Sequence, residues 1–247
     1  MNYTISIFIV INVLLFLMGC STEKNLSFEE YINNANSCVE KGDIDKGIYF
    51  YKKAEGVRSN DAAPHLALGK LYNQIWEKSY DETYAKYKEE LRRGAKSSLD
   101  LNEELKKYGL KYQYKDMALS EYKEVVRIEP NNLDARNYLA IYYLNNKQYT
   151  DAIKEYNSIL QRDNKSSLVY WHLADAYLRA GDFNHAIEHI ENAYKIEKKV
   201  DYYQYRLGEV YFKMKNFGKA FQTLSTLRNE KSIYYNKLID YKISNGM

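Results

Sequence analysis

Apolar and small residues recur along the chain with a period close to 34 residues. Five tyrosines mark this period, at intervals of 36, 35, 34 and 34 residues: Tyr72, Tyr108, Tyr143, Tyr177 and Tyr211. Most of them follow a small residue in a helical pattern, as Tyr177 follows Ala174. A polar turn, an aromatic residue and a second small residue come next, as in Gly181-Asp182-Phe183 followed by Ala186. The pattern predicts pairs of helices that pack through small residues and repeat along the chain.

This combination resembles the tetratricopeptide repeat, a pair of antiparallel helices with a period of about 34 residues. The resemblance covers most of the chain and implies an all-α, right-handed solenoid, in which stacking buries the apolar face that one pair alone leaves exposed. The phase divides residues 28–234 into six repeats: 28–61, 62–97, 98–132, 133–166, 167–200 and 201–234. Residues 235–247, with Leu238 and Tyr241 on one face, are expected to form a C-terminal capping helix.

Close approach of the two helices in a repeat requires small residues at the contact. These are Ala35, Gly69, Ala140, Ala174 and Gly208 on first helices, and Gly47, Ala118, Ala152, Ala186 and Ala220 on second helices. Large residues are expected to fill the space to the next repeat: Tyr51, Tyr87, Tyr122, Tyr156, Ile190 and Leu224. The third repeat fits least well, because Leu105 takes a small position. An alternative makes residues 73–113 a charged helical insertion in an array of five repeats, whereas the even spacing favours six.

The first twenty residues follow a different pattern. Residues 5–18 form an apolar run broken by Ser6 and Asn12. As a helix the run would span about 21 Å, short of a bilayer core of about 30 Å, so it is typical of a secretion signal. It ends in Leu17-Met18-Gly19-Cys20, which resembles the bacterial lipobox, where the cysteine is lipidated and begins the mature chain. We expect a signal peptide at 1–19 and a lipidated Cys20 with a short tether at 20–27.

The tether leads directly into the repeats. Ser27 and Glu30 form the pattern of a capping box, which predicts a helix start seven residues after Cys20. The lipobox resemblance implies a lipid-anchored protein of the cell membrane or outer membrane, facing the periplasm or the exterior. Lipidation of Cys20 would leave Cys38 without a disulfide partner, so no disulfide framework is expected.

Composition favours protein partners. The 36 Lys and Arg nearly balance the 33 Asp and Glu, the net charge is +3, and basic residues are scattered, which argues against nucleic-acid binding. The sequence contains no phosphate-binding loop, no nucleophile elbow and no paired-cysteine metal motif. We therefore expect no catalytic residue, metal, cofactor or small-molecule substrate.

One pattern points to a different function. His185-Ala186-Ile187-Glu188-His189 matches H-x-x-E-H, in which two histidines hold zinc and the glutamate acts as base. Ala186 already serves as a small contact position, so the two histidines should point to the outer surface, and no third ligand is evident. His65 and His172 have no partner at metal spacing. A zinc metallohydrolase is the alternative function, and a purely structural envelope spacer is another.

First helices of tetratricopeptide families line a concave groove that binds peptides. The resemblance carries positions 2, 5, 9, 12 and 13 of each repeat over to this chain. The predicted groove residues are Asn137, Ile141, Trp171, Asp175, Leu178, Arg179, Tyr205, Glu209, Phe212 and Lys213. Position 5 lacks lysine in the last three repeats, which disfavours the lysine-and-asparagine clamp with which some members hold a terminal carboxylate. We expect a scaffold or adaptor that binds another envelope protein, unless the aromatic residues only pack between helices.

Overall fold

The structure is a computed structural model that describes residues 26–94, 103, 105, 112–198, 201–225, 240 and 244. Its helices are α2 (Phe28–Glu40), α3 (Ile44–Val57), α4 (Ala62–Arg92), α6 (Tyr112–Ile128), α7 (Leu133–Asn145), α8 (Tyr149–Leu160), α9 (Ser167–Ala180), α10 (Phe183–Ile196), α11 (Asp201–Lys213) and α12 (Phe217–Ser225). The described residues contain no strand, which agrees with the all-α expectation. They form two compact parts, one ending at Pro64 and one starting at His65.

The first part contains α2 and α3. The predicted capping box is present, because the Ser27 hydroxyl accepts from the Glu30 amide and the Glu30 carboxylate accepts from the Ser27 amide. The two helices approach so closely that a methyl group at Gly47 would lie 2.5 Å from the Val39 side chain. A small residue is therefore required at this crossing, as the sequence pattern indicates.

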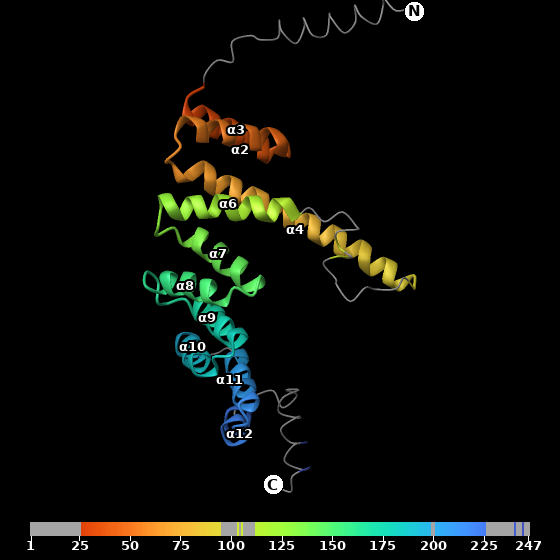
Figure 1. Cartoon of the computed structure of the whole chain (residues 1–247), viewed down its shortest axis with the longest axis vertical. Coiled ribbons are helices and arrows are strands. Elements are labelled where there is room, and N and C mark those ends of the chain that lie inside the picture. The colour runs from red at the N-terminus through yellow and green to blue at the C-terminus, as the bar shows by residue number, and fades with distance from the viewer. Residues whose placement is uncertain are drawn as a thin grey trace, which may run out of the picture. The chain divides into compact units, whose positions relative to one another are not determined.

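The second part stacks helices in sequence order. Each helix from α6 to α12 contacts the next along the chain, and Figure 1 shows them as successive elements from yellow-green to blue. The predicted contact alanines of these helices are fully buried: Ala118, Ala140, Ala152, Ala174, Ala186 and Ala220. The predicted fillers Tyr122, Tyr156, Ile190 and Leu224 are buried as well. The core of this part is thus continuous from one helix pair to the next.

Helix α4 departs from the division into six repeats. That division places two helices within residues 62–97, but α4 runs as one helix from Ala62 to Arg92. No glycine or proline stands between Gly69 and Gly94, and Gly94, with φ of 88°, follows the helix end. Trp76, Tyr80 and Tyr84 stack at intervals of four residues, with ring centroids 5.7 and 5.9 Å apart, and so continue the helical face. The chain has no local signal for a turn here.

Helix α4 has α6 as its partner. A methyl group at Gly69 would come within 3.2 Å of the Tyr122 ring, and Tyr72 packs on Tyr114 with centroids 5.9 Å apart. Tyr87, predicted as a filler between repeats, instead stacks half-buried on Tyr84 of the same helix, at 6.2 Å. These contacts favour the alternative of five helix pairs, with residues 73–113 inserted within the second pair.

Several predictions lie outside the described residues. They are the signal peptide, Cys20, most of residues 98–111 including Tyr108, and most of the proposed capping helix at 235–247. Where the structure does describe the chain, first helices start at Phe28, Ala62, Leu133, Ser167 and Asp201. These are the predicted first residues of five of the repeats.

Candidate functional site

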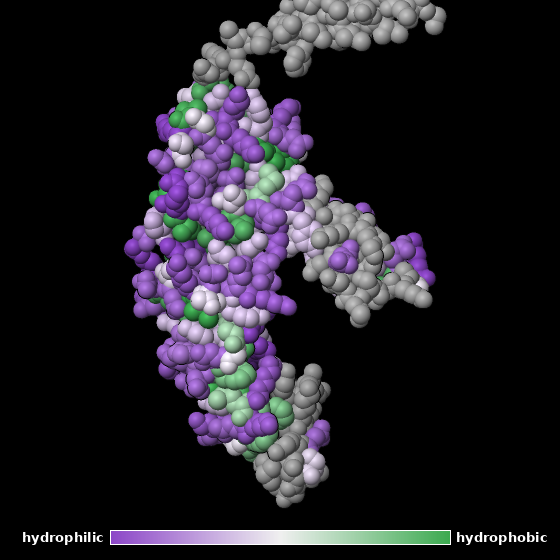
Figure 2. Space-filling model, viewed as in Figure 1, coloured by the Kyte–Doolittle hydropathy of each residue, from purple (hydrophilic) through white to green (hydrophobic). Residues whose placement is uncertain are grey.

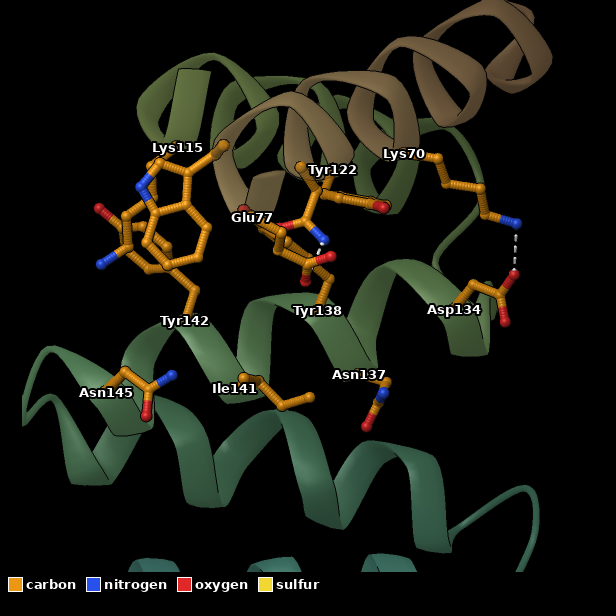
Figure 3. A pocket seen from close by; sticks show the side chains of 12 residues that line it. Lys70, Glu77, Lys115, Tyr122, Asp134, Asn137, Tyr138, Ile141, Tyr142 and Asn145 are labelled. Atoms are coloured by element: carbon orange, nitrogen blue, oxygen red, sulfur yellow. Dashed lines mark hydrogen bonds and ion pairs between the residues drawn. The ribbon is translucent and has the colours of Figure 1, made fainter. Parts of the chain in front are cut away.

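A pocket lies where the first helices α4 and α7 face each other beside α6. Its volume is about 400 Å³. Side chains from all three helices line it: Lys70, Asn73, Trp76, Glu77, Lys115, Tyr122, Asp134, Asn137, Tyr138, Ile141, Tyr142 and Asn145. In Figure 3, Lys115 and Lys70 lie toward opposite ends, while Asn145, Ile141 and Asn137 follow one another along α7. The size and the mixed lining are those of a site for a small ligand or a short peptide segment.

The repeat register explains which residues line the pocket. Asn137 and Ile141, both predicted groove residues, occupy positions 5 and 9 of the repeat that starts at Leu133. Lys70 and Asn73 occupy positions 9 and 12 of the repeat that starts at Ala62, so the same rule extended to that repeat finds them. Trp76 does not occupy one of these groove positions. It reaches the pocket because α4 continues past the end of an ordinary repeat helix.

One ion pair joins the two first helices across the pocket, and one hydrogen bond lies within α4 beside it. The Lys70 ammonium lies 2.8 Å from an Asp134 carboxylate oxygen, and this ion pair joins α4 to α7. Beside it on α4, the Asn73 amide donates to the Glu77 carboxylate at 2.9 Å. Both pairs are exposed, so they orient the pocket wall and contribute little to folding stability.

Lys115 lies against aromatic rings. Its Nζ is 5.5 Å from the centroid of the Trp76 ring and 5.0 Å from that of Tyr142, within the range of cation–π attraction. Burial lowers the pKa of this ammonium, while the neighbouring Asp116 carboxylate raises it. The two rings thus hold a partly desolvated positive charge at one end of the pocket.

Two tyrosines form the middle of the pocket. The rings of Tyr122 and Tyr138 stack with centroids 4.1 Å apart. Burial raises the pKa of Tyr122 to about 12, with smaller contributions from Asp134 and Glu77, and it also raises the pKa of Tyr138. Both phenols are therefore neutral at physiological pH and offer hydrogen bonds and apolar ring faces.

Comparison with known proteins identifies the architecture. Three profiles of the tetratricopeptide repeat family match residues 116–176, 168–200 and 202–230. These matches run from α6 through α12. The chain is a tetratricopeptide repeat protein. No curated protein sequence matches it.

Solved structures confirm the solenoid fold of this tetratricopeptide repeat protein. MamA from Desulfovibrio magneticus RS-1 aligns with a TM-score of 0.56 and 15% identity, covering 89% of this chain and 97% of MamA. Another MamA crystal structure gives 0.57 and 18%, covering 89% and 93%. A structure of PilF from Pseudomonas aeruginosa gives 0.53 and 14%, covering 89% and 86%. At these identities the likeness concerns the fold alone.

Several predicted groove residues of the last two tetratricopeptide repeats contact other side chains of α9 and α11. The Trp171 ring packs edge-on against the Tyr202 ring, with centroids 5.1 Å apart. The Arg206 guanidinium lies 5.0 Å from the centroid of the Trp171 ring. Glu209 is buried and accepts from Arg206 at 2.6 Å, with the Lys213 ammonium 3.1 Å away. In this part of the groove, aromatic and charged side chains of α9 and α11 therefore form a network with one another.

The remaining predicted groove residues divide by exposure. Asp175 accepts from Arg179 at 2.9 Å, and the Arg179 side chain is about half exposed. Leu178, Tyr205 and Phe212 are half-buried and pack against the apolar clusters between helices. The structure thus leaves exposed surface mainly on Ile141, Arg179 and Lys213, while packing accounts for much of the other side chains.

The H-x-x-E-H stretch lies on α10. His185 is exposed and its Nδ1 lies 2.6 Å from the Asp182 carboxylate. His189, expected on the outer surface, is instead half-buried, and its ring stacks on Tyr177 at 5.4 Å. Burial lowers the pKa of His189. Within the described part of the chain, no third ligand atom converges with this stretch as a metal site would require.

The other candidate residues occupy structural positions. His65 Nδ1 lies 2.8 Å from the Glu121 carboxylate, joining α4 to α6. His172 stacks on Tyr156 with centroids 5.8 Å apart, and burial lowers the pKa of His172. Cys38 is a half-buried free thiol on α2. Each of these side chains packs within the repeats, as the sequence pattern predicts.

Proposed function

We propose that the chain is a lipid-anchored scaffold of the bacterial cell envelope that binds a segment of another envelope protein in its first-helix groove. The observation that carries the proposal is the pocket between α4, α6 and α7, which opens on the predicted groove residues Asn137 and Ile141. A binding function without catalysis is consistent with this site, since its tyrosines are neutral and its carboxylates are paired or hydrogen-bonded.

The character of the surface favours a peptide partner. In the view of Figure 2, hydrophilic residues cover most of the surface and apolar residues form small patches between them. Among the described residues, exposed large apolar side chains lie on several first helices: Leu91 on α4, Leu133 and Ile141 on α7, Leu168 on α9 and Tyr202 on α11. Separate apolar anchors among polar side chains suit a segment that places individual side chains, more than a large apolar interface.

Lipid anchoring rests on the sequence. None of the helices in the described residues has the length and apolar character needed to cross a bilayer. The lipobox-like Leu17-Met18-Gly19-Cys20 provides an attachment point close to the first helix. Two or three acyl chains at one cysteine bind a membrane stably, whereas a single chain binds only marginally.

The anchor is tested by Cys20→Ala. We expect this variant to move from the membrane fraction to the soluble fraction, because it removes the only proposed attachment to lipid. The measurement is fractionation of cells followed by immunoblotting, with Cys38→Ala as the control that should stay in the membrane fraction. Retention of a cleaved, unacylated Cys20→Ala chain in the membrane would contradict lipid anchoring.

The groove is tested by a photo-crosslinking residue in place of Ile141, in the full chain in intact cells. Ile141 is 37% exposed and lines the pocket, so it should capture one predominant envelope protein. The same residue in place of Lys154, exposed on the second helix α8, should capture much less of that protein. Equal capture at both positions, or none at Ile141 and at Tyr202, would favour the purely structural spacer.

A further inference from the structure

Glu77 is a pocket carboxylate that no cation pairs with among the described residues. Within the same residues, its one hydrogen bond comes from the neutral Asn73 amide, which donates to Oε1, so Oε2 accepts none. Lys78 follows Glu77 on α4 but does not line the pocket. The Glu77 side chain is exposed, and an exposed carboxylate is negatively charged at neutral pH. In Figure 3 it lies in the middle of the pocket, between Lys115 toward one end and Lys70 toward the other.

The charges around the pocket leave this carboxylate uncompensated. The Lys70 ammonium is paired with Asp134 at 2.8 Å. Lys115 is the other lysine that lines the pocket, and the neighbouring Asp116 carboxylate is the charge that raises the pKa of its ammonium against the effect of burial. Because each lysine has a carboxylate of its own, Glu77 adds a negative charge, which is complementary to a cation on a ligand.

The aromatic walls suit a guanidinium group. Burial raises the pKa of the stacked phenols Tyr122 and Tyr138, and the Glu77 carboxylate raises it further, which means that this charge lies close to both rings. The pocket already holds one cation on an aromatic face, since the Lys115 ammonium lies 5.5 Å from the Trp76 ring centroid. A planar guanidinium can pack on a ring and also donate two parallel hydrogen bonds to one carboxylate, whereas an ammonium acts as a point charge.

We propose that the pocket binds an arginine side chain of the partner segment, with its guanidinium on the Glu77 carboxylate and an adjacent apolar side chain on Ile141. The inference rests on the proposed function and specifies the partner at that site. A volume of about 400 Å³ is within the range of pockets that hold small ligands, so one long side chain can enter. Ile141 lines the same pocket and is 37% exposed, so it remains available for the second contact.

Glu77 reaches the pocket because α4 is long. The first helices α7, α9 and α11 end after 13 or 14 residues. Glu77 is the sixteenth residue of α4, so an ordinary first helix would not carry it. Recognition of a cation is thus a property of this chain's insertion, and it has the opposite sign to the family's clamp for a terminal carboxylate.

The test measures binding of short peptides to the purified full chain by isothermal titration calorimetry at low ionic strength. The probe is N-acetylated, C-amidated Ala-Ala-Arg-Leu-Ala-Ala, and two further peptides replace arginine with citrulline, its uncharged isostere, or with lysine. We expect the arginine peptide to bind at least about fivefold more tightly than the citrulline peptide, because an ion pair on an exposed carboxylate contributes about 1 kcal/mol. This preference should disappear at about 1 M salt, where charges are screened within about 3 Å.

Tryptophan signals report whether the peptide binds at this pocket. The chain contains two tryptophans, Trp76 in the pocket and Trp171 against Tyr202 of α11. In protein labelled with 5-fluorotryptophan, the arginine peptide should shift the ¹⁹F signal of Trp76 and leave that of Trp171 in place. A Trp171→Phe variant assigns the two signals. A shift confined to Trp171 would overturn the proposal.

Variants separate the charge of Glu77 from the shape of the pocket. Glu77→Gln should abolish the preference for arginine over citrulline, and Glu77→Lys should instead favour a peptide with glutamate at that position. Glu82→Gln, exposed on the same helix, should leave the preference unchanged. Because Glu77 is exposed, these variants are expected to keep the helical circular dichroism of the native chain.

Three results would overturn the proposal. They are equal binding of the arginine and citrulline peptides by the native chain, an unchanged preference in Glu77→Gln, and a lysine peptide that binds as tightly as the arginine peptide. Capture of a partner at Ile141 would in each case leave the scaffold function standing.

Discussion

Replacing Tyr156 with alanine is expected to lower the free energy of unfolding by about 3–5 kcal/mol, the cost of removing a large buried aromatic side chain. Tyr156 on α8 is fully buried, and its ring fills the space between α8 and α9 together with Leu144 and Leu173. The substitution would leave a cavity in the middle of a stack in which each described helix from α6 to α12 packs on the next along the chain. Urea unfolding followed by helical circular dichroism measures the loss, and separate transitions for the two sides of the cavity are expected.

Tyr156→Phe is the matched control. The Tyr156 hydroxyl is buried without a hydrogen-bond partner among the described residues, so its removal leaves no acceptor or donor behind. We expect a change of at most about 1 kcal/mol, in the stabilising direction if the hydroxyl is unsatisfied in solution. A loss below about 1 kcal/mol for Tyr156→Ala would contradict the role of this ring as filler between repeats.

Replacing Arg136 with alanine is expected to cost about 3 kcal/mol, because it leaves a largely buried carboxylate without its partner. The Arg136 guanidinium on α7 lies 2.5 Å from the Glu155 carboxylate on α8, and the side chains are 16% and 12% exposed. Arg136 also donates from Nε to the Pro130 carbonyl at 2.6 Å, which ties the turn before α7 to the same pair. The measurement is again urea unfolding of the full chain.

Replacing both partners tests the explanation. The double variant Arg136→Met with Glu155→Met should recover most of the lost stability, because no buried charge is then left unpaired. The exposed pair of Lys46 and Asp43, with side chains 69% and 42% exposed, supplies the control. Lys46→Ala should cause no measurable change. A double variant as unstable as Arg136→Ala would mean that packing, and not the unpaired charge, accounts for the loss.

The sequence pattern predicted the helix pairs wherever small residues marked the crossing. The starts at Leu133, Ser167 and Asp201 follow from the period, because Ala140, Ala174 and Gly208 must each fall on the same face. The sequence pattern did not predict that α4 continues to Arg92 as one helix. The 36-residue interval between Tyr72 and Tyr108 is close to the repeat period, so the intervening segment looked like an ordinary repeat. Periodicity alone does not distinguish a repeat from an insertion of similar length.

The sequence predicted only the part of the site that follows the repeat positions. Asn137 and Ile141 lie in the pocket as the groove positions indicate, and the same positions in the second repeat point to Lys70 and Asn73. The position of Lys115 in the pocket was not predictable from the sequence. It depends on the packing of α6 against α4, which brings Lys115 to the Trp76 ring. For Trp171, the sequence left packing and exposure open, and the structure shows a half-buried ring against Tyr202.

The packing of Tyr122 and the length of the second helix pair bear on how a repeat array can gain or lose units. Its ring meets Gly69 inside the second pair and stacks on Tyr138 of the next repeat. Genetic duplication or loss of a 34-residue unit, such as 133–166 or 167–200, preserves the phase of all later helices. The second pair is different, since its helices begin at Ala62 and Tyr112 and are separated by the insertion. Unequal recombination can therefore lengthen or shorten the C-terminal half of the array in whole units, but loss of the unit 133–166 would remove α7 and with it half of the residues that line the pocket.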